Sequence, residues 1–328
     1  MMVCAAICLS SVAAATLSSC AGGNRSATAA SVTSADTLRT VAVSADSLYS
    51  HVVKQVELGP RTPGSTAHGR CVELITGYMN ECGVDTTMVQ TAPVTTFKGE
   101  KFTAKNIFAQ INRAADNRVL LLAHYDTRPW ADSDPDEAMH GTPIDGANDG
   151  ASGVAVLMEV ARVLAPQLPD SIGVDLLFVD MEDSGESGGD SEETWCLGTQ
   201  EWIRQMPYNS DNRPRFGILL DMVGGTDALF HCEYFSQRHA SPVVDKVWNI
   251  ARRSGFGDRF VNKNGGAVVD DHLFINRAGI PCIDIIESIN EHTGSFNPTW
   301  HTMADNIANI DRSSLQAAAQ TVVNTILN

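Results

Sequence analysis

Acidic and histidine side chains follow three apolar segments of the chain directly, which places groups that can bind metal or move protons at the ends of these segments. Val119–Ala123 precedes His124 and Asp126, Leu176–Val179 precedes Asp180, Glu182 and Asp183, and Ile218–Leu220 precedes Asp221. Asp149 lies in the loop Gly146–Gly150, and His301 lies in a loop rich in Gly, Pro and Asn. Imidazole and carboxylate are zinc ligands, and catalytic zinc sites use three of them and keep one position open.

Each of these residues also has an ordinary structural interpretation. Asp149 is suited to cap the helix that follows it, His124 to be a buried, hydrogen-bonded histidine, and Glu182 with Asp183 to belong to a solvated acidic loop. Taken together the ordinary interpretations weaken, because carboxylates that converge on one place repel each other unless a cation holds them. The combination therefore predicts a metal site.

The elements that must position these residues alternate along the chain between helical and strand-like patterns. The expected helices are 47–58, 65–79, 151–166, 243–253 and a capped C-terminal helix after Asp311, and the expected strands are 119–123, 174–179, 216–220 and 281–286. Continuous apolar runs of this length are typical of strands buried on both faces. The pattern predicts an α/β fold for residues 44–328: a single three-layer domain with a mostly parallel central sheet flanked by helices. Ligands of such sheets bind beyond the carboxyl ends of the strands, where the acidic residues lie.

The charge balance excludes some partners. The 328 residues include 39 acidic and 23 basic side chains, a net charge of -16, which repels nucleic acids and anionic lipid surfaces. Three of the eight cysteines lie before residue 21, and no two of the others have C-x-x-C spacing. A structural zinc knuckle is therefore not expected, and at most two disulfides are compatible with the remaining cysteines, whose pairing stays open: Cys71, Cys82, Cys196, Cys232 and Cys282.

The N-terminal segment is expected to direct export. Residues 1–19 are apolar and small, too short for a membrane span, and are interpreted as a signal peptide. The sequence Leu17-Ser18-Ser19-Cys20 resembles a bacterial lipobox, in which Cys20 becomes the lipidated first residue. Residues 20–43 are then a Ser/Thr/Ala-rich tether, and the protein is an exported lipoprotein, anchored in a membrane by its lipid and facing the periplasm or the cell surface. An ordinary cleaved signal peptide is the alternative.

Several motifs occur in an order that matches a known superfamily. These are His124-x-Asp126, the segment Gly146–Gly153 around Asp149, Glu182-Asp183, Asp221 and Trp300-His301-Thr302. From about Ser44 to its end the chain resembles the zinc-dependent aminopeptidases and their offshoot, the animal-type glutaminyl cyclases, which implies the fold predicted above.

The two branches use these residues differently. By resemblance to the aminopeptidases, one zinc would be held by His124 and Asp221 and a second by Asp183 and His301, with Asp149 bridging them. Glu182 would then be the general base. By resemblance to the cyclases, a single zinc would be held by Asp149, Asp183 and His301. In that case His124 is not a ligand, and Asp126 is a plausible partner for its ring.

Three features are closer to the cyclases. Trp300 stands where aminopeptidases usually have Tyr, Asp270-Asp271-His272 matches a cyclase segment, and residues 296–306 resemble the cyclase sequence around the last zinc ligand. The resemblance implies a glutaminyl-peptide cyclotransferase, which converts the N-terminal glutamine of peptides or proteins to pyroglutamate. The roles that it implies are a proton shuttle at Glu182, a hold on the leaving nitrogen by Asp221 and Asp270, and pocket walls formed by Phe296 and Trp300. The acidic loop 184–194 has no counterpart in that family, and Trp195 after it is expected, apart from the resemblance, to form a second aromatic wall.

The chain also departs from the animal cyclases. Asp183 replaces a glutamate that is one methylene longer, and Asp284 stands in the place of a histidine on the last strand. Two alternatives stay open: a two-zinc aminopeptidase that hydrolyses N-terminal residues, and a peptide-binding lipoprotein without catalysis. Zinc content separates the first from a cyclase.

Overall fold

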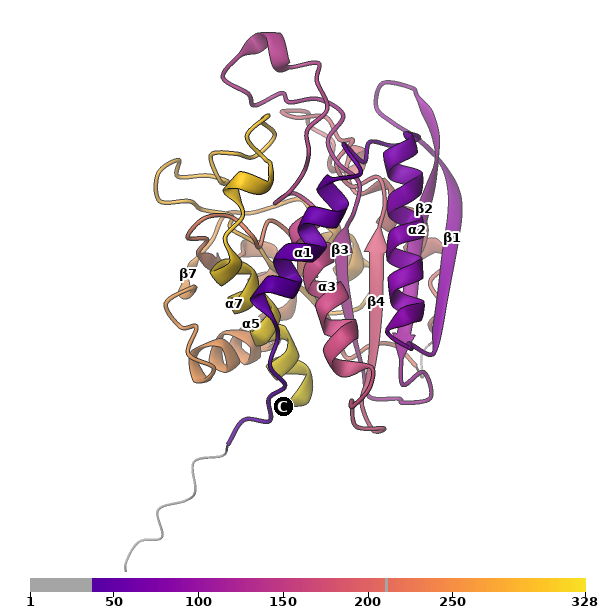
Figure 1. Cartoon of the computed structure of the whole chain (residues 1–328), viewed down its shortest axis with the longest axis vertical. Coiled ribbons are helices and arrows are strands. Elements are labelled where there is room, and N and C mark those ends of the chain that lie inside the picture. The colour runs from indigo at the N-terminus through magenta and orange to yellow at the C-terminus, as the bar shows by residue number, and fades with distance from the viewer. Residues whose placement is uncertain (1–36, 210–211) are drawn as a thin grey trace, which may run out of the picture. The chain divides into compact units, whose positions relative to one another are not determined.

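The computed structural model describes residues 37–209 and 212–328 (Figure 1). The predicted signal peptide, Cys20 and most of the predicted tether lie outside these residues. The described end of the tether contacts the C-terminal helix, where the Val43 amide donates to Gln320 Oε1 at 3.1 Å. Within the described ranges, no helix combines the length and the apolar character needed to cross a membrane.

A six-stranded sheet with the order β1-β2-β4-β3-β5-β8 forms the centre of the molecule. Its strands are β1 (Thr86–Thr95), β2 (Lys101–Ile111), β3 (Arg118–His124), β4 (Gly173–Val179), β5 (Phe216–Leu220) and β8 (Cys282–Ile285). The four strands β4, β3, β5 and β8 run parallel, and β1 and β2 are antiparallel additions at one edge. The four parallel strands are the predicted ones, so the α/β prediction with a mostly parallel sheet is confirmed.

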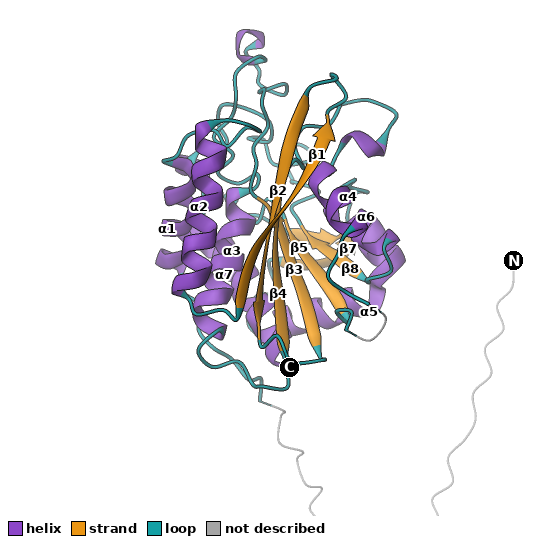
Figure 2. Ribbon diagram, turned by 90° about the vertical axis from the view of Figure 1, so that its right-hand side faces the viewer, coloured by secondary structure: helices purple, strands orange, loops and turns teal. Residues whose placement is uncertain are grey.

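Seven helices within the described residues complete the fold. They are α1 (Ala45–Val56), α2 (Thr66–Glu81), α3 (Ala151–Leu164), α4 (Leu197–Arg204), α5 (Tyr234–Arg253), α6 (Asp271–Arg277) and α7 (Arg312–Leu327). Figure 2 shows α1, α2, α3 and α7 on one face of the sheet and α4 and α6 on the other, which gives the predicted three layers. Short elements add the pair β6 (Phe230–Cys232) with β7 (Phe260–Asn264) and the 3-10 turns η1 (Glu137–Met139), η2 (Glu192–Thr194) and η3 (Ile307–Asn309).

Strand β3 shows why the sheet is buried on both faces. All seven of its residues are buried. Leu121 and Ala123 belong to the larger core with α1, α3 and α7, whereas Leu120 and Leu122 belong to the core on the opposite face. Successive side chains of a strand point to opposite faces, so a continuous apolar run is what this central position requires.

Two sequence expectations on helix ends are settled by the structure. Asp311 caps α7 as predicted, with its carboxylate accepting from the Ser313 amide at 2.8 Å. The alternative interpretation of Asp149, as the cap of α3, is wrong: the capping position is Gly150, and no side chain among the described residues caps this helix. The carboxylate of Asp149 is therefore left for other partners.

The cysteines of the described chain are free thiols at all five positions predicted to be available. Four of them are buried in the core or beside it, and Cys82 is partly exposed.

Candidate metal centre and adjoining pocket

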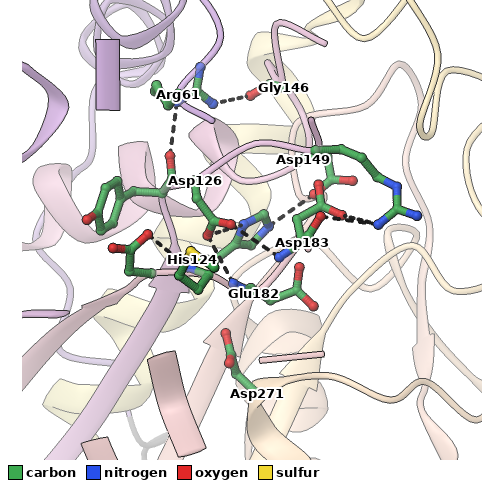
Figure 3. Close-up of polar contacts among 12 residues, drawn as sticks. Arg61, His124, Asp126, Gly146, Asp149, Glu182, Asp183 and Asp271 are labelled. Carbon is green, nitrogen blue, oxygen red and sulfur yellow. Dashed lines mark hydrogen bonds and ion pairs between the residues drawn. The ribbon is translucent and has the colours of Figure 1, made fainter. Parts of the chain in front are cut away.

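The carboxyl ends of β3, β4 and β5 deliver the predicted residues to one place. His124 is the last residue of β3, Glu182 and Asp183 follow β4, and Asp221 follows β5. Asp149 reaches the same place from the loop before α3. Figure 3 shows the ring of His124 lying between the carboxylates of Asp126 and Asp149.

The first group of potential ligands surrounds His124. Its Nε2 lies 3.0 Å from Asp149 Oδ1 and 3.2 Å from Asp221 Oδ1. Its Nδ1 lies 3.6 Å from Asp126 Oδ1. Asp126 thus lies beside the ring nitrogen that faces away from the other two carboxylates.

The second group surrounds His301. Its Nε2 lies 3.1 Å from Asp183 Oδ1 and 3.5 Å from Asp149 Oδ2. Its Nδ1 lies 3.3 Å from Asp132 Oδ1. Asp149 contributes one oxygen to each group, so the structure brings together all five residues of the two-metal pattern and all three of the one-metal pattern.

Two buried aspartates fix the loops that carry these ligands. Asp126 accepts from the amides of Glu182 and Asp183, at 3.1 and 3.2 Å. Asp305 accepts from the amides of Asn148 and Asp149, at 2.8 and 3.1 Å. Each carboxylate spans two consecutive amides, which holds the ligand loop against the end of the sheet.

The buried guanidinium of Arg61 supports the same region from behind. It donates to the carbonyl oxygens of Tyr125, Asp145 and Gly146, at 3.0, 2.6 and 2.7 Å (Figure 3). These carbonyls flank the loops that carry Asp126 and Asp149. Arg61 lies in the loop between α1 and α2.

The residues present fit a zinc ion. Asp183 Oδ2 is buried and has no hydrogen-bond partner among the residues that the structure describes. The donor atoms of each group, Asp149 with Asp183 and His301, or Asp149 with His124 and Asp221, lie within 4.8 Å of one another. Burial raises the pKa of Asp183, with Asp149 adding to the increase, and burial likewise raises the pKa of Asp221 to about 6. Buried carboxylates in this state need a cation, and a set of imidazole and carboxylate donors suits zinc.

A pocket of about 270 Å³ opens beside the metal centre. It is lined by the predicted aromatic residues Phe296, Trp300 and Trp195 and by the carboxylates of Glu182 and Asp270. Trp300 stacks on His301 with ring centroids 3.7 Å apart, and Phe296 packs on Trp300 at 4.8 Å. The aromatic walls therefore adjoin the potential metal ligands directly.

Glu182 faces this pocket from a constrained backbone. The preceding residue, Met181, has a φ of 58°, an uncommon value for a side chain of this size. Burial raises the pKa of Glu182 well above the ordinary range, and although His124 opposes the increase, Asp270 adds to it. The buried thiol of Cys196 lies 3.6 Å from Glu182 Oε1 and donates toward it. A carboxyl group in these surroundings is suited to accept and return protons near neutral pH.

Further carboxylates lie below the pocket. Burial raises the pKa of Asp270 to about 7, with Asp221 adding to the increase. Asp284 and Asp271 are buried and lack hydrogen-bond partners for both of their side-chain oxygens among the described residues. His272 lies between this group and Glu233, whose Oε2 is 3.1 Å from His272 Nε2. Asp284, which stands where the animal cyclases have a histidine, therefore adds a carboxyl group to an already acidic region.

Several residues that shape the site were not predicted from the sequence. Arg128, Asp132 and Cys196 contact Asp183, His301 and Glu182 respectively. Arg128 and Asp132 lie in an irregular segment after His124-x-Asp126, where no strand or helix pattern indicates their direction. Asp305 lies within the segment 296–306 used for the resemblance, but nothing in the sequence indicated its role.

The comparisons with known proteins agree with this geometry. The sequence pattern of peptidase family M28 matches residues 106–326. The solved structure of Bacteroides thetaiotaomicron glutaminyl cyclase bound to N-acetylhistamine is similar, with 43% identity and a TM-score of 0.85, over 88% of this chain and 99% of that chain. A Zn-dependent exopeptidase from Parabacteroides distasonis is similar to the same degree, with 42% identity and a TM-score of 0.84, over 88% and 100% of the two chains.

A curated relative extends the similarity to animals. The glutaminyl-peptide cyclotransferase of Bos taurus is 26% identical over 238 residues, which cover 64% of this chain. The matched region spans 62% of the length of the bovine protein.

Proposed function

The chain belongs to peptidase family M28, and we propose that within this family it acts as a glutaminyl-peptide cyclotransferase. The reaction converts an N-terminal glutamine of a peptide or protein to pyroglutamate and releases ammonia. The similarity to the Bacteroides thetaiotaomicron glutaminyl cyclase, at 43% identity over nearly all of that chain, supports this activity.

One observation carries the choice of reaction: Glu182 and Asp270 face the same aromatic pocket, with carboxyl oxygens within 4.8 Å of each other. A cyclisation needs a group that takes a proton from the amine and a second group that holds the departing amide nitrogen. Two neighbouring carboxyl groups that share a proton can do both. The walls formed by Trp300 and Phe296 offer apolar surface for the methylenes of a glutamine side chain.

The residues of the chain act on a substrate whose reacting groups are already close. The α-amine attacks the γ-carbonyl carbon of the same glutamine, so proximity is built into the substrate. Glu182 accepts the proton of the amine and delivers it to the leaving nitrogen. Asp270 and Asp221 hold this nitrogen while it departs as ammonia, and the aromatic walls exclude water from the reacting carbon.

A single zinc ion is proposed for this activity. Asp149, Asp183 and His301 would hold it, and it would supply a Lewis acid for the γ-carbonyl oxygen. In this arrangement His124 keeps its contacts with Asp149 and Asp221 and orients them.

Metal removal tests the proposal. Chelation of the purified protein is expected to abolish ammonia release from a peptide that begins with glutamine, and about one equivalent of zinc is expected to restore it. Ammonia release that is unaffected by chelation would contradict the zinc assignment. Ammonia release that is absent even from the zinc-loaded protein would contradict the cyclase activity.

A two-zinc aminopeptidase is the second candidate, because His124, Asp149 and Asp221 form a complete additional donor group. The similarity to the Zn-dependent exopeptidase supports it. This candidate requires about two zinc ions per chain and release of the free N-terminal residue from a peptide.

Export and lipid anchoring remain part of the proposal on the strength of the leader sequence alone. We propose that Cys20 carries a lipid and that residues 20–43 tether the catalytic domain to a membrane. Mass spectrometry of the mature N-terminal peptide from producing cells tests this, and an unmodified Cys20 or cleavage at another residue would contradict it.

A further inference from the structure

We propose that Arg128 is a positioning residue of the metal centre, which holds in place the two residues Asp183 and His301 that would bind the ion. The proposal rests on the zinc assignment made above and is independent of the reaction. Arg128 lies four residues after His124, and its side chain is fully buried.

Arg128 contacts the loop after β4, which carries Asp183. Arg128 Nη1 donates to the carbonyl oxygens of Asp183 and Gly185, both at 3.2 Å, and lies 3.4 Å from Asp183 Oδ1. One nitrogen thus fixes both the backbone of the ligand and its carboxylate. Asp183 has a short side chain, so its reach toward the metal is set by where this backbone is held.

Arg128 is also connected to His301, through Asp132. Arg128 Nε and Nη2 donate to the two oxygens of Asp132, at 2.9 and 2.6 Å. Asp132 Oδ1 in turn lies 3.3 Å from His301 Nδ1. A carboxylate on the outer nitrogen of a ligand histidine fixes the ring and raises its basicity. The forked guanidinium therefore connects both ligands, which the single ammonium of a lysine cannot do in the same geometry.

Arg128 also contacts the aromatic wall of the pocket. The guanidinium carbon of Arg128 lies 5.0 Å from the ring centroid of Trp195 and 4.9 Å from that of Trp130. Trp195 also packs so closely on Gly185 that a Cβ there would enter its indole. The same side chain that positions the ligands thus supports the Trp195 wall of the pocket.

The opposite end of β3 offers a matched control. Arg118 is also buried, pairs with Asp175 through both of its oxygens, and donates to the carbonyl oxygens of Asn112 and Ala115 at 2.7 and 3.2 Å. It resembles Arg128 in burial and in the type of its partners but lies at the far end of the strand from the ligands. Its loss is expected to destabilise the fold without changing the metal centre.

Zinc affinity, measured by chelator competition without substrate, tests the proposal. Arg128→Gln is expected to weaken zinc binding by roughly 10- to 100-fold, the range found for outer partners of metal ligands. Arg118→Gln is expected to lower the melting temperature and to leave the zinc affinity of the folded protein unchanged. Equal losses of affinity in the two variants, or no loss in Arg128→Gln, would overturn the proposal. If Arg128→Gln does not fold, Arg128→Lys replaces it with the same criteria.

A double-mutant cycle tests whether Arg128 acts through the reach of Asp183. Asp183→Glu adds one methylene, which is expected to weaken zinc binding in the parent protein but to restore part of the affinity in the Arg128→Gln background, where the loop is released. Equal effects of Asp183→Glu in both backgrounds would show that Arg128 does not act through Asp183 and would contradict the proposal. Failure of the parent protein to bind zinc would contradict the metal assignment instead.

Discussion

Glu182 acquires its chemical role from its neighbours. It is buried at the pocket, its pKa is raised by burial and by Asp270, and the thiol of Cys196 donates toward it. A glutamate on an open surface is a weak base at neutral pH, whereas one with a raised pKa can hold a proton between the two halves of a cyclisation. The chemistry therefore depends on the surroundings as much as on the carboxyl group.

Glu182→Gln tests the proton shuttle. Because glutamine keeps the shape and does not accept a proton in the same way, turnover is expected to fall by roughly 10²- to 10⁴-fold while zinc content stays unchanged. Turnover is measured by ammonia release and zinc by elemental analysis. Near-normal turnover would show that another residue is the base.

Two histidine variants distinguish the ligand sets. His301→Ala is expected to lose the zinc, since His301 is a ligand in either pattern. His124→Ala is expected to retain about one zinc per chain if a single ion is bound by Asp149, Asp183 and His301. A parent protein with about two zinc ions, reduced to one in His124→Ala, would identify the two-metal arrangement.

Much of this residue-level picture could be read from the sequence, because His and acidic residues are common zinc ligands and the ends of buried strands are visible as apolar runs. Asp149, Glu182, Asp183, Asp221 and His301 all meet where the sequence placed them. Arg128, Asp132 and Cys196 could not be found in this way, because their contacts depend on irregular loops whose course leaves no periodic signal.

Helix α3 positions Asp149 because two glycines let it approach the sheet closely. A Cβ on Gly150 would collide with the carbonyl oxygen of His124, and one on Gly153 with the carbonyl oxygen of Leu220. Both collisions are with backbone, which cannot move aside without shifting β3 or β5. The close approach of the helix is thus what brings Asp149 into contact with His124.

Gly153→Ala is expected to push α3 away from β5. The predicted consequences are a loss of about 1–3 kcal/mol of stability and weaker zinc binding, measured by chemical denaturation and chelator competition. Gly77→Ala is the control, because Gly77 lies in α2 with no atom near its missing Cβ. Alanine there is expected to stabilise the helix by about 0.5–1 kcal/mol. Identical behaviour of the two variants would contradict the packing argument.

The parallel strands were predictable, and the antiparallel edge was not. β3, β4, β5 and β8 are short apolar runs, since they are covered on both faces. β1 is mostly exposed or half-buried and contains Pro93, a composition tolerated at the edge of a sheet but weak as a strand signal. α5 was predicted only from Val243 onward because Pro242 and the kink at Ala240 interrupt its pattern.

In the molecule as a whole, the metal-free site disfavours the ionised form of its own buried carboxyl groups. Burial raises the pKa of Asp221 to about 6 and that of Asp270 to about 7. Despite burial, which acts in the opposite direction, the charge of Asp183 and the contact with Asp132 raise the pKa of His301 to about 9. These groups hold more protons in the folded state than in the unfolded state between their ordinary and raised pKa values.

The metal-free protein is therefore expected to lose stability as pH rises. The carboxyl groups contribute less stability as pH rises from about 4 to 7, and His301 loses its contribution between about 6.5 and 9. Burial alone would raise the pKa of Glu233, but the contact with His272 outweighs burial and lowers it to about 2. The stability contributed by Glu233 therefore increases with pH, but only at low pH. Melting temperatures from pH 5 to 9 test this, and zinc is expected to raise them more at pH 8 than at pH 5. A metal-free melting temperature that increases with pH would contradict the account.

The most direct test of the central claim uses two peptides that differ only in their first residue, glutamine or leucine. Each is incubated with the zinc-loaded protein, and the products are identified by mass spectrometry. We expect loss of ammonia from the glutamine peptide, with its chain length unchanged, and no change in the leucine peptide. Release of free leucine or free glutamine would contradict it and would identify the protein as an aminopeptidase.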